Sequence, residues 1–108
     1  MDDAIYLFGV SRYKSVDEQP EVELHDWSIV RGTDGPHFIG SRHGMNGRCS
    51  TPIVAFDESL MHGKTASGRV YHLVGPKNED RSNVCAELVW SQYQQANNVQ
   101  EVPWEATH

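Results

Sequence analysis

The sequence lacks the features of several classes of protein. It has only two cysteines, Cys49 and Cys85, and no CxxC pair, which argues against a secreted disulfide scaffold. No apolar run approaches the ~18 residues of a membrane span. The chain also opens on Met1-Asp2-Asp3, where a secretory signal would carry lysine or arginine. We therefore predict a cytoplasmic protein without a membrane partner.

Familiar motifs of nucleotide, metal and nucleophile chemistry are also missing. Gly63-Lys64-Thr65 ends like a phosphate-binding P-loop, but Glu58 stands where that motif needs a glycine. The six histidines show neither His-x-His nor His-Glu-x-x-His spacing, so we predict no metal and no cofactor. No Gly-x-Ser-x-Gly elbow occurs. We predict no catalytic residues and favour a protein that is not an enzyme.

The length of 108 residues allows one domain. Hydrophobic residues make up 38% of the chain, and its aromatic residues and nine glycines are typical of a polar but folded protein. We place the domain at residues 1–98 and a tail at residues 99–108. Because a tryptophan buries a large area, Trp104 predicts that residues 99–104 dock on the domain or on a second subunit.

Hydrophobic patterning predicts several short strands. An apolar run at residues 4–10 indicates a core strand, and residues 22–29 and 37–40 indicate a hairpin around a turn-rich segment. Residues 49–56 form a further candidate. In residues 69–74 the alternation places Tyr71 and Leu73 on the core face, with Val70, His72 and Val74 on the other. Residues 40–48 and 63–68 have the composition of loops.

The last third of the chain has helical periodicity. The apolar stripe predicts a helix over residues 83–96 and consists of Val84, Cys85, Leu88, Val89, Tyr93 and Ala96. Ser82 or Asn83 is expected to cap it. The fold class is therefore α+β: a small, strongly bent antiparallel sheet or half-open barrel of five or six strands with one C-terminal helix.

The net charge of −6 is unevenly distributed. Residues 27–77 carry six basic and three acidic side chains, whereas residues 1–26 carry two and seven and residues 78–108 carry one and five. The overall charge disfavours nucleic acid as a partner without ruling it out. The basic middle is either a surface for a partner or a segment that the acidic ends neutralise by folding back.

A glycine-rich basic segment is the best candidate for a binding site. Residues 41–48 read Ser-Arg-His-Gly-Met-Asn-Gly-Arg, and glycines with arginine donors suit phosphate or carboxylate. The predicted binding residues are Arg42, His43, Arg48, Lys64 and Arg69. The alternative is an exposed hairpin loop with ordinary charged residues.

A resemblance adds a genomic context. Residues 50–54, Ser-Thr-Pro-Ile-Val, and residues 65–76, which include Ser67-Gly68-Arg69-Val70-Tyr71, resemble small uncharacterised bacterial proteins that are often carried on phage or other mobile DNA. The resembling stretch spans about a quarter of the chain. It implies a mobile-element origin and contributes no catalytic residues.

Two functional hypotheses follow. The first is a non-enzymatic binding or regulatory module, encoded on mobile DNA, that contacts a protein partner or a small anionic ligand through the basic segment. The second is a small enzyme or ligand-binding protein with a pocket between sheet and helix and a histidine as acid or base. A homodimer that uses Trp104 or the Tyr71 strand is a further possibility.

Overall fold

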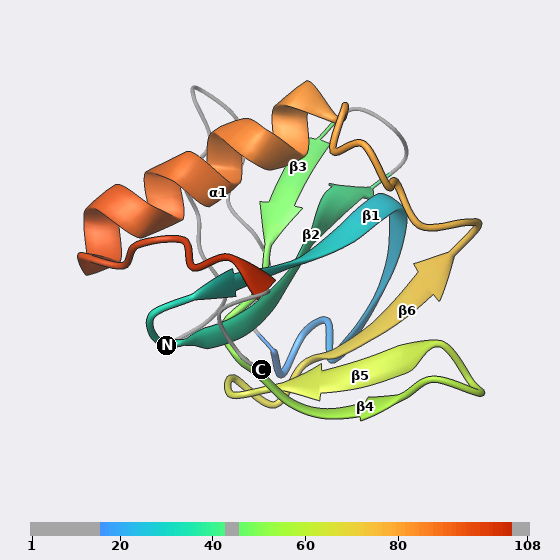
Figure 1. Cartoon of the computed structure of the whole chain (residues 1–108). Coiled ribbons are helices and arrows are strands. Elements are labelled where there is room, and N and C mark those ends of the chain that lie inside the picture. The colour runs from blue at the N-terminus through green and yellow to red at the C-terminus, as the bar shows by residue number, and fades with distance from the viewer. Residues whose placement is uncertain (1–15, 43–45, 105–108) are drawn as a thin grey trace.

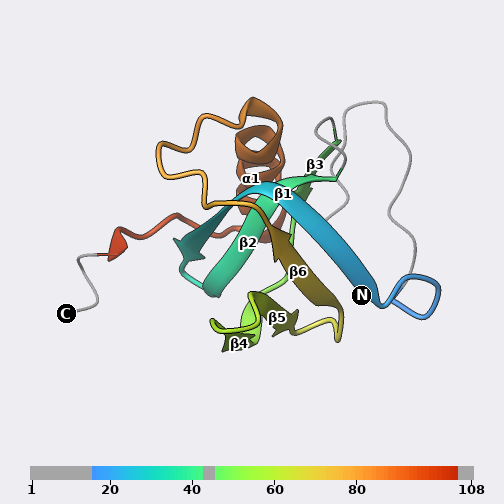
Figure 2. The ribbon, with the colours of Figure 1, turned by 90° about the vertical axis from the view of Figure 1, so that its right-hand side faces the viewer.

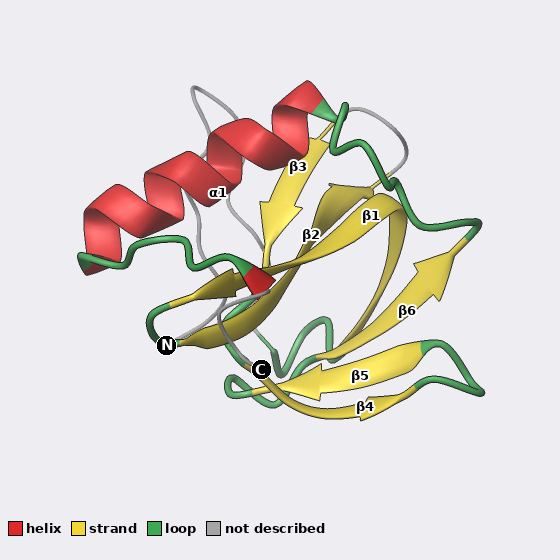
Figure 3. Ribbon diagram, viewed as in Figure 1, coloured by secondary structure: helices red, strands yellow, loops and turns green. Residues whose placement is uncertain are grey.

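A computed structural model describes residues 16–42 and 46–104, which form one sheet and one helix (Figures 1 and 3). The strand predicted at residues 4–10 and residue His43 lie outside the described residues. In chain order the elements are β1 (Glu21–Gly32), β2 (Gly35–Arg42), β3 (Asn46–Cys49), β4 (Ile53–Asp57), β5 (His62–Thr65), β6 (Val70–Val74) and α1 (Val84–Asn97). The strands lie in the order β3-β2-β1-β6-β5-β4. The predicted α+β class is confirmed.

The sheet is mixed, and the prediction of an antiparallel sheet is wrong. β1 and β6 pair in parallel, from Glu21 beside Val70 to His25 beside Val74, whereas the other four pairs are antiparallel. A parallel pair needs a long connection, which here contains β2 to β5. Within β1–β2–β3 and within β4–β5–β6, each strand pairs with the next strand in the chain. The two units join through β1 and β6, the first and last strands that the structure describes.

The predicted strand boundaries hold in part. The β1–β2 hairpin is confirmed, with a two-residue turn before Gly35, whose φ is +128°. The predicted loop at residues 40–48 instead contains the end of β2 and most of β3, and the predicted loop at 63–68 contains most of β5. The single strand predicted at residues 49–56 is divided, because Cys49 ends β3 and β4 begins at Ile53.

The helix is confirmed, but its buried face differs from the predicted stripe. Asn83 caps its first turn by accepting a hydrogen bond from the Ala86 amide, and Asn98 ends it in the left-handed conformation. Val84 and Leu88 are exposed, at 68% and 44%. The buried residues are Ala86, Val89, Trp90 and Tyr93. Trp90, absent from the stripe, is 1% exposed, and burying its large ring sets the rotation of the helix.

Two apolar clusters lie on opposite faces of the β1–β2 hairpin. Cluster 1 lies beneath α1 and includes Val30, Ile39 and Trp90. Cluster 2 includes Leu24, Phe38 and Tyr71 and lies on the side toward which β4 and β5 fold. The consecutive residues Phe38 and Ile39 belong to different clusters, because successive side chains of a strand point to opposite faces of the sheet. Figure 2 shows α1 at one end of the molecule and β4 and β5 at the other.

Residues 99–104, which we call the strap, lie along the C-terminal half of β1. The Val102 amide donates to the Arg31 carbonyl (2.7 Å), and the Thr33 amide donates to the Gln100 carbonyl (2.9 Å). The Trp104 indole donates to the Ile29 carbonyl at 3.4 Å and is 48% exposed. The strap thus forms hydrogen bonds with backbone groups in and just after the part of β1 that extends past its pairing with β6.

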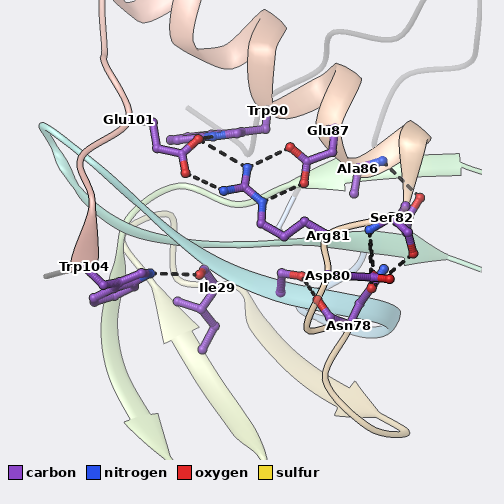
Figure 4. A network of polar contacts seen from close by, with 12 residues as sticks. Ile29, Asn78, Asp80, Arg81, Ser82, Ala86, Glu87, Trp90, Glu101 and Trp104 are labelled. Carbon is purple, nitrogen blue, oxygen red and sulfur yellow. Dashed lines mark hydrogen bonds and ion pairs between the residues drawn. The ribbon is translucent and has the colours of Figure 1, made fainter.

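Arg81 connects the strap to α1 (Figure 4). Its guanidinium donates to both carboxylate oxygens of Glu87, at 2.8 and 2.7 Å, and to both carboxylate oxygens of Glu101. The Trp90 indole donates to Glu101 at 2.8 Å. One cation therefore bridges a carboxylate of the helix and a carboxylate of the strap.

Candidate functional site

The four predicted binding residues that the structure describes do not gather on one surface. Arg48 and Arg69 are 1% and 0% exposed. Arg48 donates to the Tyr71 hydroxyl at 3.3 Å, and its guanidinium lies 5.8 Å from the centre of that ring. Arg42 is half-buried at the end of β2, and Lys64 is exposed on β5. Two of the six basic side chains in the basic middle of the sequence are thus interior, because Arg48 and Arg69 occupy inward-facing positions like that of Tyr71.

A different set of polar residues gathers around Lys64, on the outer face of β4, β5 and β6. Strand registers place Ala55, Lys64, Val70 and Glu21 in one row across four strands. The next row on the same face is Asp57, His62, His72 and Glu23. Inward-facing Tyr71 and Leu73 are buried, so the rows lie on the side of the sheet away from cluster 2. We call these two rows the outer grid.

Two imidazoles lie side by side in the grid. The rings of His62 and His72 meet edge to face with their centres 5.5 Å apart. The His72 Nε2 donates to Glu21 Oε1 at 2.7 Å, and this pair is substantially exposed to solvent, with side-chain exposures of 39% and 65%. The grid therefore already holds one carboxylate against an imidazole.

Asp57, at the end of β4, is fixed by the turn that follows. Its Oδ1 accepts hydrogen bonds from the Ser59 hydroxyl at 2.8 Å, the Ser59 amide at 3.0 Å and the Leu60 amide at 3.1 Å. Led by the Ser59 hydroxyl and the Leu60 amide, and helped by nearby His62, these contacts lower the pKa of Asp57. Asp57 therefore stays ionised at pH values below those at which an aspartate usually becomes protonated.

The outer grid is hollowed into an open groove of about 460 Å³. Small apolar side chains, Ala55 and Val70, line it together with the polar residues Glu21, Asp57, His62, Lys64 and His72. Lys64 forms no ion pair with any residue in the described ranges. An apolar floor with a few polar groups at its rim is the usual composition of a ligand site.

The groove adjoins an open edge of the sheet. β4 is the last strand in the order, and among the described residues no strand pairs with its outer side. Val54 is 62% exposed, Phe56 39%, and Leu60, in the turn after the strand, 64%. The only charged side chain of β4 is Asp57, which the turn holds. An apolar edge with free backbone donors and acceptors is a template for pairing with another strand.

A second histidine cluster is buried and closed. His37 is 0% exposed, with Nε2 2.7 Å from Asp34 Oδ1 and Nδ1 2.6 Å from the Ser50 carbonyl. Tyr93 donates to the other carboxylate oxygen of Asp34 at 2.6 Å. Both nitrogens of His37 are thereby engaged, and its ring packs against Trp90 and Tyr93. This arrangement stabilises the contact between β2 and α1.

No group of three or more His, Cys, Asp or Glu in residues 16–42 and 46–104 is arranged to hold a metal ion. No helix in those ranges is long and apolar enough to cross a membrane.

Sequence reasoning identified Lys64 as a site residue but missed that His62, Glu21 and His72 line the groove with it. Alternation in residues 69–74 correctly places His72 on the face opposite Tyr71, but it does not select His72 as a site residue. Nothing in the sequence indicates that a strand pairs with β6 at His72, because β5 lies in a segment with the composition of a turn. Comparisons with models of protein families, with curated proteins and with solved structures find no match.

Proposed function

We propose that the protein is a non-enzymatic binding module that takes an extended segment of a partner protein onto the edge of β4. The observation that carries the proposal is the apolar, exposed edge beside an open groove. Backbone groups of β4 would supply the main-chain hydrogen bonds, and alternate side chains of the partner segment would reach the groove or the apolar residues. Carriage on mobile DNA, which the resemblance implies, is part of this proposal.

The expected partner segment is apolar with one acidic position. Val54 and Phe56 offer apolar contacts at the edge. Lys64 stands next to Ala55 in the register of β4 and β5, so its ammonium lies one strand in from the edge. A carboxylate on the bound segment would pair with this cation.

The test is selection of binding peptides from a random library displayed on phage, followed by measurement of each selected peptide against two variants. Val54→Lys places a charge in the edge strand, as natural edges do to prevent pairing. Val84→Lys is the matched control, because Val84 is equally exposed, at 68% against 62%, but lies on α1. We expect Val54→Lys to weaken peptide binding about tenfold or more, and Val84→Lys to leave it unchanged.

Mapping the bound peptide by amide chemical shifts completes the test. Shifts at the β4 amides that disappear in Val54→Lys support the proposal. Peptides that bind Val54→Lys as tightly as the unchanged protein would overturn it. A β4-dependent rise in mass by light scattering, with no peptide bound, would instead assign the edge to a second copy of the chain.

The second candidate is a small-ligand protein with a histidine acid or base, and the imidazole pair favours it. Its pocket would be the groove on the outer face, because the space between sheet and helix is filled by cluster 1. Turnover of a small substrate that is lost in His72→Gln would distinguish it from the binding module.

A further inference from the structure

The groove carries a set of groups whose charge depends on pH. Imidazoles change charge between about pH 5 and 8, and His62 and His72 stand next to each other in its wall. The charged groups that face this pair are Lys64 from β5, Asp57 from β4, and Glu21 and Glu23 from β1. Every element that flanks the pair thus contributes at least one charge.

Protonation of the two imidazoles reverses the charge of the groove. Among its lining residues, Glu21 and Asp57 oppose Lys64, so one net negative charge remains while both histidines are neutral. Two added protons leave one net positive charge. Since the site is open to solvent, the field at a bound group depends on these close charges rather than on distant ones.

The contact between His72 and Glu21 shows which ligand chemistry the groove accepts. The imidazole holds a carboxylate at 2.7 Å on the exposed surface. His62, the neighbouring imidazole, has no carboxylate at hydrogen-bonding distance among the described residues; Asp57 acts on it through charge while its Oδ1 holds the turn. A second carboxylate therefore has a place between His62 and Lys64, which lie two residues apart on one face of β5.

We propose that the groove binds a carboxylate with an apolar body, and that proton uptake by His62 and His72 strengthens this binding as the pH falls. The carboxylate would be held by Lys64 and His62, and its apolar body would lie over Ala55 and Val70. In the cell the carboxylate would belong to the partner segment, and in that respect the inference rests on the proposed function. The groove itself is testable without a partner.

The experiment titrates the full chain with 4-phenylbutanoate and, as a neutral control, 4-phenylbutanamide, and follows amide chemical shifts at pH 5.5 and 7.5. We expect the acid to shift the amides of β5 and β6 and to bind about fivefold to tenfold more tightly at pH 5.5. The amide should show no dependence on pH. Carbon-bound imidazole protons report the charge of each histidine in the same samples.

Variants separate the histidine pair from general effects of pH. The double variant His62→Gln/His72→Gln should bind the acid with equal affinity at both pH values. His25→Gln is the matched control, because His25 on β1 has a side-chain exposure of 37% against 39% for His72 and lies outside the groove lining. This control should retain the full dependence on pH. Glu21→Gln should tighten binding, since it removes a negative charge from the groove lining.

Equal binding of the acid at both pH values would overturn the inference, as would a dependence that survives in the double variant. The peptides selected against β4 identify the source of the carboxylate: loss of binding on C-terminal amidation assigns the terminus, and loss on Asp→Asn or Glu→Gln change assigns a side chain. If Val54→Lys shows that the peptides do not bind at the edge of β4, the titration with 4-phenylbutanoate still tests the groove. The two proposals can therefore fail separately.

Discussion

Arg81 is the cation that holds the strap to α1, and its replacement tests whether charge fixes this segment. The guanidinium makes two-point contacts with Glu87 and with Glu101, and Glu101 also accepts from the Trp90 indole (Figure 4). In Arg81→Ala the two carboxylates keep their positions but lose the positive charge between them. The strap then depends on its backbone hydrogen bonds and on the contacts of Trp104.

The size of the effect follows from geometry and exposure. An exposed ion pair contributes roughly 0.2–1 kcal/mol, and two-point contacts between arginine and carboxylate lie at the upper end. The three side chains are 34–36% exposed, so solvent screening limits each pair to that range. Two pairs give about 1–2 kcal/mol, which lowers the Tm of a domain of this size by roughly 5–10 °C.

The assay is thermal unfolding followed by circular dichroism, together with hydrogen exchange of the Val102 amide, which donates to Arg31 in the folded protein. We expect a lower Tm and faster exchange at Val102. Lys77→Ala, an exposed cation with no ion pair in the described ranges, is the control and should leave both unchanged. Arg81→Lys should fall between, because an ammonium cannot make two-point contacts with both carboxylates. A Tm within 1 °C of the Lys77→Ala value would refute the reasoning.

Two further predictions concern acid and close packing. Partial burial raises the pKa of Glu101, but the hydrogen bonds from Arg81 and the Trp90 indole, together with the charge of Arg81, outweigh burial and lower the pKa. The ionised Glu101 therefore stabilises the folded protein fully above about pH 4.3, the usual pKa of a glutamate. This stabilisation is lost as the pH falls through the lower pKa that Glu101 has in the folded protein. Exchange of strap amides should accelerate there, and Glu101→Gln should remove the dependence. A Cβ on Gly47 would lie 2.2 Å from the Cys85 carbonyl oxygen in α1, so Gly47→Ala should cost about 3 kcal/mol by urea unfolding. The control is Asn46→Ala at the exposed neighbour of Gly47, which should change the free energy of unfolding by less than about 0.5 kcal/mol. Equal urea midpoints for the two variants would show that α1 moves away from the added methyl group at no cost.

Local patterns predicted the elements that local forces determine. The β1–β2 hairpin follows from alternation around turn residues, and the helix start follows from two candidate caps, Ser82 and Asn83, before an apolar run; the structure selects Asn83. The mixed sheet could not be predicted in this way, because the parallel pairing of Glu21 with Val70 joins segments far apart in the chain. No turn chemistry reports which distant strands become neighbours.

The candidate site shows the same limit. Residue type selected Arg48 and Arg69 as ligands for an anion, yet strand alternation turns both inward beside Tyr71, where they are buried. The groove instead depends on His62 and His72 being opposite each other. That register is a property of the paired strands, and neither histidine stands in a recognisable motif.

The acidic ends of the sequence meet two kinds of cation, and the difference separates stability from binding. Glu101 meets a guanidinium, which remains charged at any ordinary pH, so the strap is held without interruption from neutral pH down to the ionisation range of the glutamate. Glu21 meets the imidazole of His72, and imidazole is the group whose charge our proposal of pH-dependent binding invokes. A fall from pH 7.5 to 5.5 leaves the contact between Arg81 and Glu101 intact, because the pKa of Glu101 is lowered below its usual value. Changes in ligand affinity over that interval then report on the groove rather than on loosening of the strap.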